Sequence, residues 1–271
     1  MTITIAMAGK GGTGKTTLAA MVLKYLRGRN LGPVLAIDAD PSSNLNSALG
    51  MRLEATVGDV REETAIRVGG GVIPPGMAKR DYLELRINEA LVEGQGLDLI
   101  AMGRPEGPGC YCAANHILRE VVDRIAGSYS FVVIDNEAGL EHLSRRTTRD
   151  VDFLLVVSDP TIRGLVAAGR VAGIVNELQT RVGKVLLVVN RVQGELGPAL
   201  REEIERQGLE LAGVVPADPR VGAYDGEGVP LVDLPEDSAV YRAVAEIVDK
   251  MLDWRGISRE ASSGRPARGE G

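Results

Sequence analysis

The sequence predicts an α/β fold in which helices cover both faces of a mostly parallel sheet of about seven strands. Short apolar runs recur along the chain, at residues 2–8, 34–37, 97–102, 131–135, 153–157, 184–189 and 214–218. Helical patterns separate most of these runs, and such alternation favours parallel strands joined by right-handed crossovers. With 271 residues, 44% of them hydrophobic, the chain can bury the core of one large domain, which we expect over residues 1–256.

The chain begins with a strand, a glycine-rich loop and a helix. The loop spans residues 9–16, Gly-Lys-Gly-Gly-Thr-Gly-Lys-Thr, and matches the phosphate-binding pattern G-x-x-x-x-G-K-[ST]. Its glycines let backbone N–H groups point into one concavity at the positive end of a helix dipole. We expect a P-loop NTPase domain that binds ATP or ADP, with Lys15 on the phosphates and the Thr16 hydroxyl on Mg²⁺. The other expected nucleotide contacts here are Gly11, Gly12, Thr13, Gly14 and Thr17. The alternative is an ordinary glycine-rich turn.

Two carboxylates, Asp38 and Asp40, follow the second strand, and Asp135 ends the fourth. The carboxyl ends of parallel strands share the sheet edge at which ligands bind, so these groups should face the phosphate loop. Asp135 is placed to hold the Mg²⁺ shell through water, and Gly139 lets the backbone approach the γ phosphate. Two alternatives remain open. Asp40 could instead cap the short helix expected at 44–49, and Asp135 could simply cap a buried strand.

Residues 51–96 are the least regular part of the chain. Helical patterns around 57–66 and 82–92 are separated by stretches rich in glycine and proline. The residue types indicate no chemistry, so we interpret this part as an insertion, which could also shape a surface for a partner.

The loop after the third strand carries both cysteines of the chain, Cys110 and Cys112. Glycine and proline around them leave freedom to turn both sulfur atoms toward one point. Two thiolates supply half of a tetrahedral or square-planar metal site. Either His116, in the helix expected at 114–125, and another group complete the site, or a symmetry-related copy of the chain does. Two incidental thiols, with His116 as a packing residue, are the alternative.

The last helix is expected at 238–252, where apolar residues at helical spacing should pack on the sheet. Beyond it, residues 257–271 are rich in Ser, Gly, Arg and Pro and predict a disordered polar tail.

Composition excludes several classes of protein. A net charge of −6 argues against a general nucleic-acid binder, which needs a basic surface. No apolar run approaches the ~20 residues of a membrane span, and the chain opens on a strand instead of a signal peptide. We therefore expect a cytoplasmic protein with neither nucleic acid nor membrane as a partner.

The phosphate loop contains an additional lysine, Lys10, directly after its first glycine. With this lysine, the loop resembles the deviant phosphate loop of the MinD, ParA and nitrogenase-iron-protein superfamily. The resemblance implies that Lys10 reaches across a homodimer to the partner's nucleotide. It also implies that Asp40 orients the attacking water while Asp38 lies near the metal. Lys10, Lys15 and Asp40 would then carry the hydrolysis.

The same resemblance places the adenine site at the ends of the last two strands. Asn190 matches the asparagine that reads the adenine edge, and Pro216 and Asp218 look like the other wall of the base pocket. Asparagine and proline are also common turn formers, so a purely local role is the alternative.

A narrower resemblance rests on Gly109-Cys110-Tyr111-Cys112 with Asn115-His116, together with residues 135–145, Asp-Asn-Glu-Ala-Gly-Leu-Glu-His-Leu-Ser-Arg. These segments are similar to the CooC-type ATPases, which assist nickel insertion into carbon monoxide dehydrogenase and the related acetyl-CoA synthase. The resemblance implies an ATP-dependent homodimer that shares Ni²⁺ or Zn²⁺ between Cys110 and Cys112 of both subunits, with one of those enzymes as the client.

Two other functions are kept as alternatives. An iron–sulfur electron-transfer ATPase like the nitrogenase iron protein would take its cysteines from well-separated loops. A MinD- or ParA-like positioning ATPase would bind membrane or DNA, against which the acidic balance and the polar tail argue.

Overall fold

Seven parallel strands form one sheet, in the order β3-β2-β4-β1-β5-β6-β7. The computed structural model of the chain describes residues 2–69, 74, 76–103, 120–137, 150–175 and 181–257. Each strand contains most of an apolar run found in the sequence, which confirms the predicted α/β class. The strands are β1 (Ile3–Ala8), β2 (Val34–Asp38), β3 (Leu97–Ala101), β4 (Phe131–Asp135), β5 (Val151–Ser158), β6 (Val182–Val192) and β7 (Leu211–Pro216).

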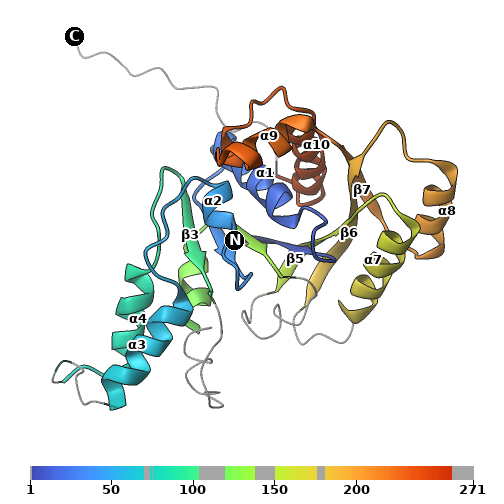
Figure 1. Cartoon of the computed structure of the whole chain (residues 1–271). Coiled ribbons are helices and arrows are strands. Elements are labelled where there is room, and N and C mark those ends of the chain that lie inside the picture. The colour runs from blue at the N-terminus through green and yellow to red at the C-terminus, as the bar shows by residue number, and fades with distance from the viewer. Residues whose placement is uncertain are drawn as a thin grey trace, which may run out of the picture.

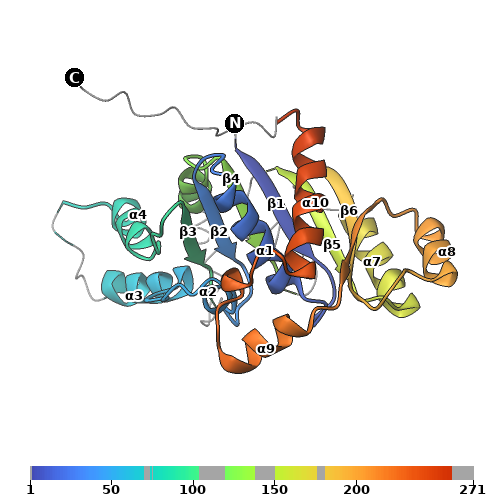
Figure 2. The same ribbon diagram turned by 90° about the horizontal axis from the view of Figure 1, so that it is seen from above.

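Helices cover both faces of this sheet, as Figures 1 and 2 show. One face is packed by α1 (Lys15–Gly28), α2 (Leu45–Ala48), the short 3₁₀ helix η2 (Leu231–Asp233) and α10 (Ala239–Trp254). The opposite face contacts α3 (Val57–Gly69), α4 (Lys79–Glu89), a helix described over 120–126, α7 (Ile162–Ile174) and α8 (Pro198–Arg206). The pair α3 and α4 extends beyond the β3 edge of the sheet.

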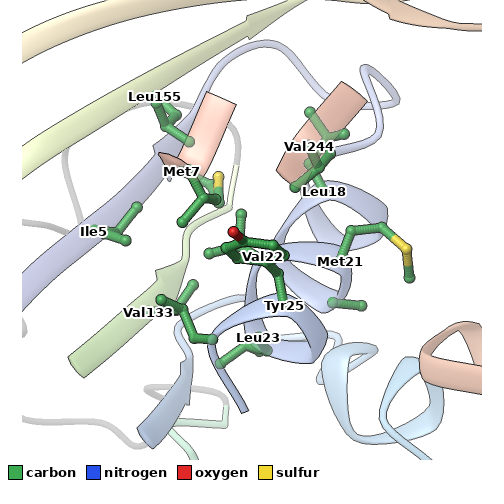
Figure 3. Close-up of a cluster of buried hydrophobic side chains, with 14 of the residues drawn as sticks. Ile5, Met7, Leu18, Met21, Val22, Leu23, Tyr25, Val133, Leu155 and Val244 are labelled. Carbon is green, nitrogen blue, oxygen red and sulfur yellow. The ribbon is translucent and has the colours of Figure 1, made fainter. Parts of the chain in front are cut away.

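Helix α1 is central to the hydrophobic core on the first of these two faces. Its residues Leu18, Val22 and Leu23 are buried against β1, β4 and α10, and Figure 3 shows them in one cluster with Met7, Val133 and Val244. Fully burying an aliphatic side chain of this size contributes about 1.5–3 kcal/mol. Because the phosphate loop joins β1 to α1, this packing fixes both ends of the loop.

The structure differs from the sequence-based expectations at three helices. Helix α4 begins and ends three residues before the predicted 82–92, because Val92 leaves the helix for an antiparallel bridge with Leu99 of β3. Helix α9 (Pro219–Glu227) and η2 were not predicted. The Asp218 side chain accepts a hydrogen bond from the Arg220 backbone N–H, and Pro219 occupies the first turn of α9. Both are recognised signals for the start of a helix.

The described chain ends near the amino-terminal edge of the sheet, opposite the phosphate loop. Trp254 is stacked on Phe153 of β5, and the Lys184 ammonium of β6 lies 3.5 Å from the centre of the indole ring. The predicted tail, from residue 258 on, lies outside the described residues. Within the described ranges, no helix combines the length and the apolar character needed to cross a bilayer.

Gly9, the first residue of the phosphate loop, lies unusually close to strand β5. Its φ is +137°, and a Cβ atom added there would lie 2.3 Å from the Val157 carbonyl oxygen. That oxygen belongs to a buried strand and cannot move away cheaply. Glycine is therefore required where β1 gives way to the loop.

We expect Gly9→Ala to destabilise the nucleotide-free protein by about 2 kcal/mol or more, through the clash and the unfavourable φ together. Gly11→Ala is the matched control, because an added Cβ there meets no described atom within 4 Å. Urea unfolding curves compare the two. Equal stability of the Gly9 and Gly11 variants would show that β5 adjusts to the added methyl group.

Candidate active site

The phosphate loop is held in shape by its own side chains. The Lys15 ammonium donates to the carbonyl oxygens of Gly9 and Lys10, each at 3.2 Å, and the Thr13 hydroxyl donates to Lys10 at 2.9 Å. Lys15 and Thr13 are buried, whereas the Lys10 side chain is exposed. Burial lowers the pKa of Lys15, and the negative charges of Asp135 and Asp40 oppose that change. The loop thus presents a cation close to two carboxylates.

Thr16 and Asp135 meet beneath the loop. The Thr16 hydroxyl donates to Asp135 Oδ2 at 2.6 Å, joining the first turn of α1 to the end of β4. Asp135 is 1% exposed, and its second oxygen is buried with no hydrogen-bond partner among the described residues. A hydroxyl and a carboxylate with an unused oxygen fit a hard divalent cation such as Mg²⁺. The structure therefore brings together the two residues that the sequence predicted for magnesium.

The environment of Asp135 favours its protonated form. Burial raises the pKa of Asp135 to about 7, the negative charge of Asp38 adds to the effect, and the Thr16 hydrogen bond acts against it. Asp38 is paired with Asp135 across β2 and β4. Two buried carboxylates side by side are expected where a cation binds.

Asp38 and Asp40 organise the segment that follows β2. Asp38 is fully buried and accepts hydrogen bonds from the backbone N–H groups of Asp40 and Leu45, at 3.1 and 2.9 Å. Asp38 therefore anchors the start of α2, whereas the Asp40 carboxylate accepts a hydrogen bond from the Ser42 backbone N–H in the turn before that helix. The alternative reading of Asp40 as the cap of this helix is wrong, and its carboxylate stays near the loop.

Two consecutive residues of β6 contact the phosphate loop from the side. The Asn190 amide donates to the Thr13 carbonyl at 2.8 Å, and the Arg191 guanidinium donates to the Gly12 carbonyl at 2.9 Å. Asn190 was expected to read adenine, and its contact with the loop was not foreseen. The sequence analysis did not identify Arg191. In the structure this residue has a φ of 59°, which is unusual for a residue other than glycine.

Asp218 serves the helices at the end of β7. Its carboxylate accepts from the backbone N–H groups of Arg220 and Ala239, each at 3.0 Å, and from the Arg220 guanidinium. Burial alone would raise the pKa of Asp218, but these hydrogen bonds outweigh it and hold the pKa below its usual value. Asp218 thus joins α9 to α10, and Pro216 ends the strand just before it. Their predicted role beside the adenine stays a prediction.

A cavity of about 400 Å³ opens beside the first turn of α1. Of the predicted site residues, Thr16 and Thr17 line it, whereas Asn190, Pro216 and Asp218 do not. Sequence analysis missed its other walls, which come from α2 and from the end of α9. The lining residues are Thr16, Thr17, Asn44, Ser47, Ala48, Asp225, Gly228, Val229 and Leu231.

Several predicted residues lie outside the described part of the chain, namely Gly139, Cys110, Cys112 and His116. In the part that the structure describes, no three His, Cys, Asp or Glu side chains gather to form a metal site. Thr16 and Asp135 form a smaller group of only two side chains. Two side chains can suffice for Mg²⁺ in a nucleotide site, because the ion takes most of its ligands there from phosphates and water.

Comparisons with known proteins agree with this geometry. A family model for the CobQ/CobB/MinD/ParA nucleotide binding domain matches residues 4–232. An uncharacterized ATP-binding protein of Methanocaldococcus jannaschii is 45% identical and covers 92% of this chain and 98% of its own length. The carbon monoxide dehydrogenase accessory protein CooC of Rhodospirillum rubrum is 29% identical, over 94% of this chain and 99% of its own length. The structure of the Pyrococcus horikoshii septum site-determining protein MinD, complexed with Mg-ADP, has the same fold, with a TM-score of 0.66 and 22% sequence identity. The match covers 95% of this chain and 98% of that chain.

The raised pKa of Asp135 predicts a pH-dependent stability. In the unfolded chain this carboxyl loses its proton near pH 4, whereas in the folded protein it does so at about pH 7. The folded state binds the extra proton between these values, so stability falls as the pH rises from about 4 to about 7. Asp135→Asn removes this loss. We expect it to raise the melting temperature by a few degrees at pH 8 and by less at pH 5, without Mg²⁺ or nucleotide.

Asp38→Asn is the matched control, because both oxygens of that buried carboxylate accept backbone N–H groups. An amide can satisfy only one of the two, so this variant should be less stable at both pH values. Thermal melts in EDTA test the pair. An Asp135→Asn variant that is destabilised more at pH 8 than at pH 5 would contradict the raised pKa.

Proposed function

Since this chain belongs to the CobQ/CobB/MinD/ParA nucleotide-binding family, we propose that it binds and hydrolyses ATP at the phosphate loop. The observation that carries the proposal is the contact at 2.6 Å between the Thr16 hydroxyl and the buried Asp135 carboxylate. It places a magnesium-type pair directly below a loop whose N–H groups and lysine suit phosphate. A glycine-rich turn with only a structural role has no need for a second carboxylate oxygen that is buried without a donor among the described residues.

Each residue of the site has a separate task in this proposal. Lys15 neutralises charge on the β and γ phosphates, and the loop N–H groups bind their oxygens. Thr16 and Asp135 hold Mg²⁺, which when bound offsets the negative charge of the phosphates. Asp40 orients the attacking water, since its carboxylate lies close enough to Lys15 to influence that lysine's pKa. Lys10, exposed at the rim of the loop, acts on the nucleotide of a partner subunit.

The nucleoside is proposed to lie beside the first turn of α1. The 400 Å³ cavity begins at Thr16 and Thr17, next to the phosphate loop, and offers the polar Asp225 and Ser47 on its walls. Asn190 and the segment 216–218 do not line this cavity, and they are proposed to contact the adenine where the nucleoside extends beyond it. The Asp218 carboxylate is engaged in capping two helices, so the backbone is the part of that segment available to the base.

The biological role proposed for this ATPase is maturation of a nickel enzyme, with carbon monoxide dehydrogenase or acetyl-CoA synthase as the client. Support comes from the similarity to the accessory protein CooC over almost the full length of both chains. The Cys110-Tyr-Cys112 segment adds two thiolates that suit Ni²⁺ or Zn²⁺ as cargo. A homodimer would supply four thiolates to one ion. A positioning ATPase is the second candidate, since MinD shares this fold.

The ATPase proposal predicts different consequences for the two lysines of the loop. Lys15→Ala should abolish binding of ATP and ADP, because its charge acts on phosphate within the same chain. Lys10→Ala should keep nucleotide binding but lose hydrolysis, by a factor of ~10³ if it acts on transition-state charge as an arginine finger does. Equilibrium dialysis and phosphate release measure the two properties, with thermal melts as the control for folding. Turnover near that of the wild type in Lys15→Ala would remove the proposed site.

The maturation proposal predicts one Ni²⁺ or Zn²⁺ per two chains. Replacing Cys110 and Cys112 by serine should abolish metal binding while leaving binding of ATP unchanged, because the phosphate loop is intact. Metal analysis and sedimentation, each with and without ATP, provide the measurement. One metal per chain, or binding that survives both substitutions, would contradict a shared site. Pelleting with anionic lipid vesicles or retention on DNA, dependent on ATP, would favour the positioning function instead.

A further inference from the structure

Strand β6 contains a β-bulge at its carboxyl end. Val189 pairs with Val214 and Val192 pairs with Pro216, so two residues of β6, Asn190 and Arg191, face one residue of β7. The bulge brings Arg191 to a φ of 59°, in the left-handed region that side chains other than glycine rarely adopt. Bulges of this kind re-aim side chains and occur often beside active sites.

The bulge has a specific effect on the two side chains. Consecutive residues of a regular strand point to opposite faces, so Asn190 and Arg191 could not both reach one neighbouring loop. Here both do, and they donate to the consecutive carbonyl oxygens of Thr13 and Gly12 at 2.8 and 2.9 Å. The contact is tight, because a Cβ atom on Gly14 would lie 2.4 Å from the Asn190 amide nitrogen.

These two hydrogen bonds determine which way the N–H groups of the loop point. Every described peptide bond is trans, so each carbonyl points away from the N–H of the same peptide unit. Holding the Gly12 carbonyl toward β6 turns the Thr13 N–H to the opposite side. Holding the Thr13 carbonyl does the same for the Gly14 N–H. These N–H groups lie in the middle of the phosphate-binding pattern.

We propose that Asn190 and Arg191 form a latch that orients the phosphate loop, with Arg191 as a positioning residue for the β phosphate of the nucleotide. The proposal rests on nucleotide binding at this loop. It gives Arg191 a role through the Gly12 peptide and not through contact with the ligand. It also explains why a long cationic side chain is kept at a backbone position that glycine would occupy more easily.

Arg191→Gly is the variant that tests the latch, because glycine tolerates the left-handed backbone and lacks the guanidinium. We expect the dissociation constant for ADP to rise about tenfold, the effect of losing one charge-assisted hydrogen bond. AMP lacks the β phosphate, so its dissociation constant should stay within about a factor of two. Displacement of a fluorescent ADP analogue by ADP or AMP gives both values on the intact chain. The melting temperature should not fall, which separates the effect from unfolding.

Salt distinguishes the latch from a general effect of the arginine's charge. A hydrogen bond within the protein should keep its effect on ADP affinity at about 0.5 M salt, whereas attraction between exposed charges is largely screened there. Equal weakening of ADP and AMP that disappears in high salt would overturn the latch in favour of a charge effect. Unchanged ADP affinity in Arg191→Gly would overturn it as well. Failure of the wild-type protein to bind ADP would instead refute the proposed function itself.

Discussion

The backbone carbonyls of the phosphate loop impose the constraint on which the site depends. A loop that turns its N–H groups toward phosphate must turn its carbonyls toward protein, and each buried carbonyl needs a donor. The described donors are the Lys15 ammonium, the Thr13 hydroxyl, the side chains of Asn190 and Arg191, and the Leu18 backbone N–H. Two of them come from β6, more than 170 residues away. The conformation of the loop thus depends on contacts with the sheet as well as on its own glycines.

The sheet order places the acidic groups under that loop at a cost in stability. Because β1 lies between β4 and β5, the end of β4 delivers Asp135 to the first turn of α1. A second carboxylate, Asp38, arrives beside it from β2. Their mutual repulsion and burial are unfavourable in the folded protein alone, and a divalent cation would relieve both. Such strain is typical of binding sites, where affinity is gained at the expense of stability.

The local features of the fold could be predicted from the sequence, and its long-range contacts could not. The strand, loop and helix around Lys15 follow from residue pattern alone, as does α10 with its Ser238 cap. The latch at Arg191 depends on a bulge set by pairing with β7, which no local pattern encodes. Asp38 and Asp40 look alike in the sequence, and only their burial separates an anchor of α2 from a residue near the loop. The adenine-site and cysteine predictions remain untested.

The position of Trp254 determines what can be learned from the protein's own fluorescence. It is the single tryptophan of the chain and lies at the sheet edge opposite the phosphate loop, against Phe153 and the Lys184 ammonium. Its emission therefore depends on whether the end of α10 is docked on β5 and β6. Intrinsic fluorescence will follow the unfolding of this domain with little interference from the optical or charge changes that accompany a bound nucleotide. Binding at the loop has to be followed by another method, such as an extrinsic label or equilibrium dialysis.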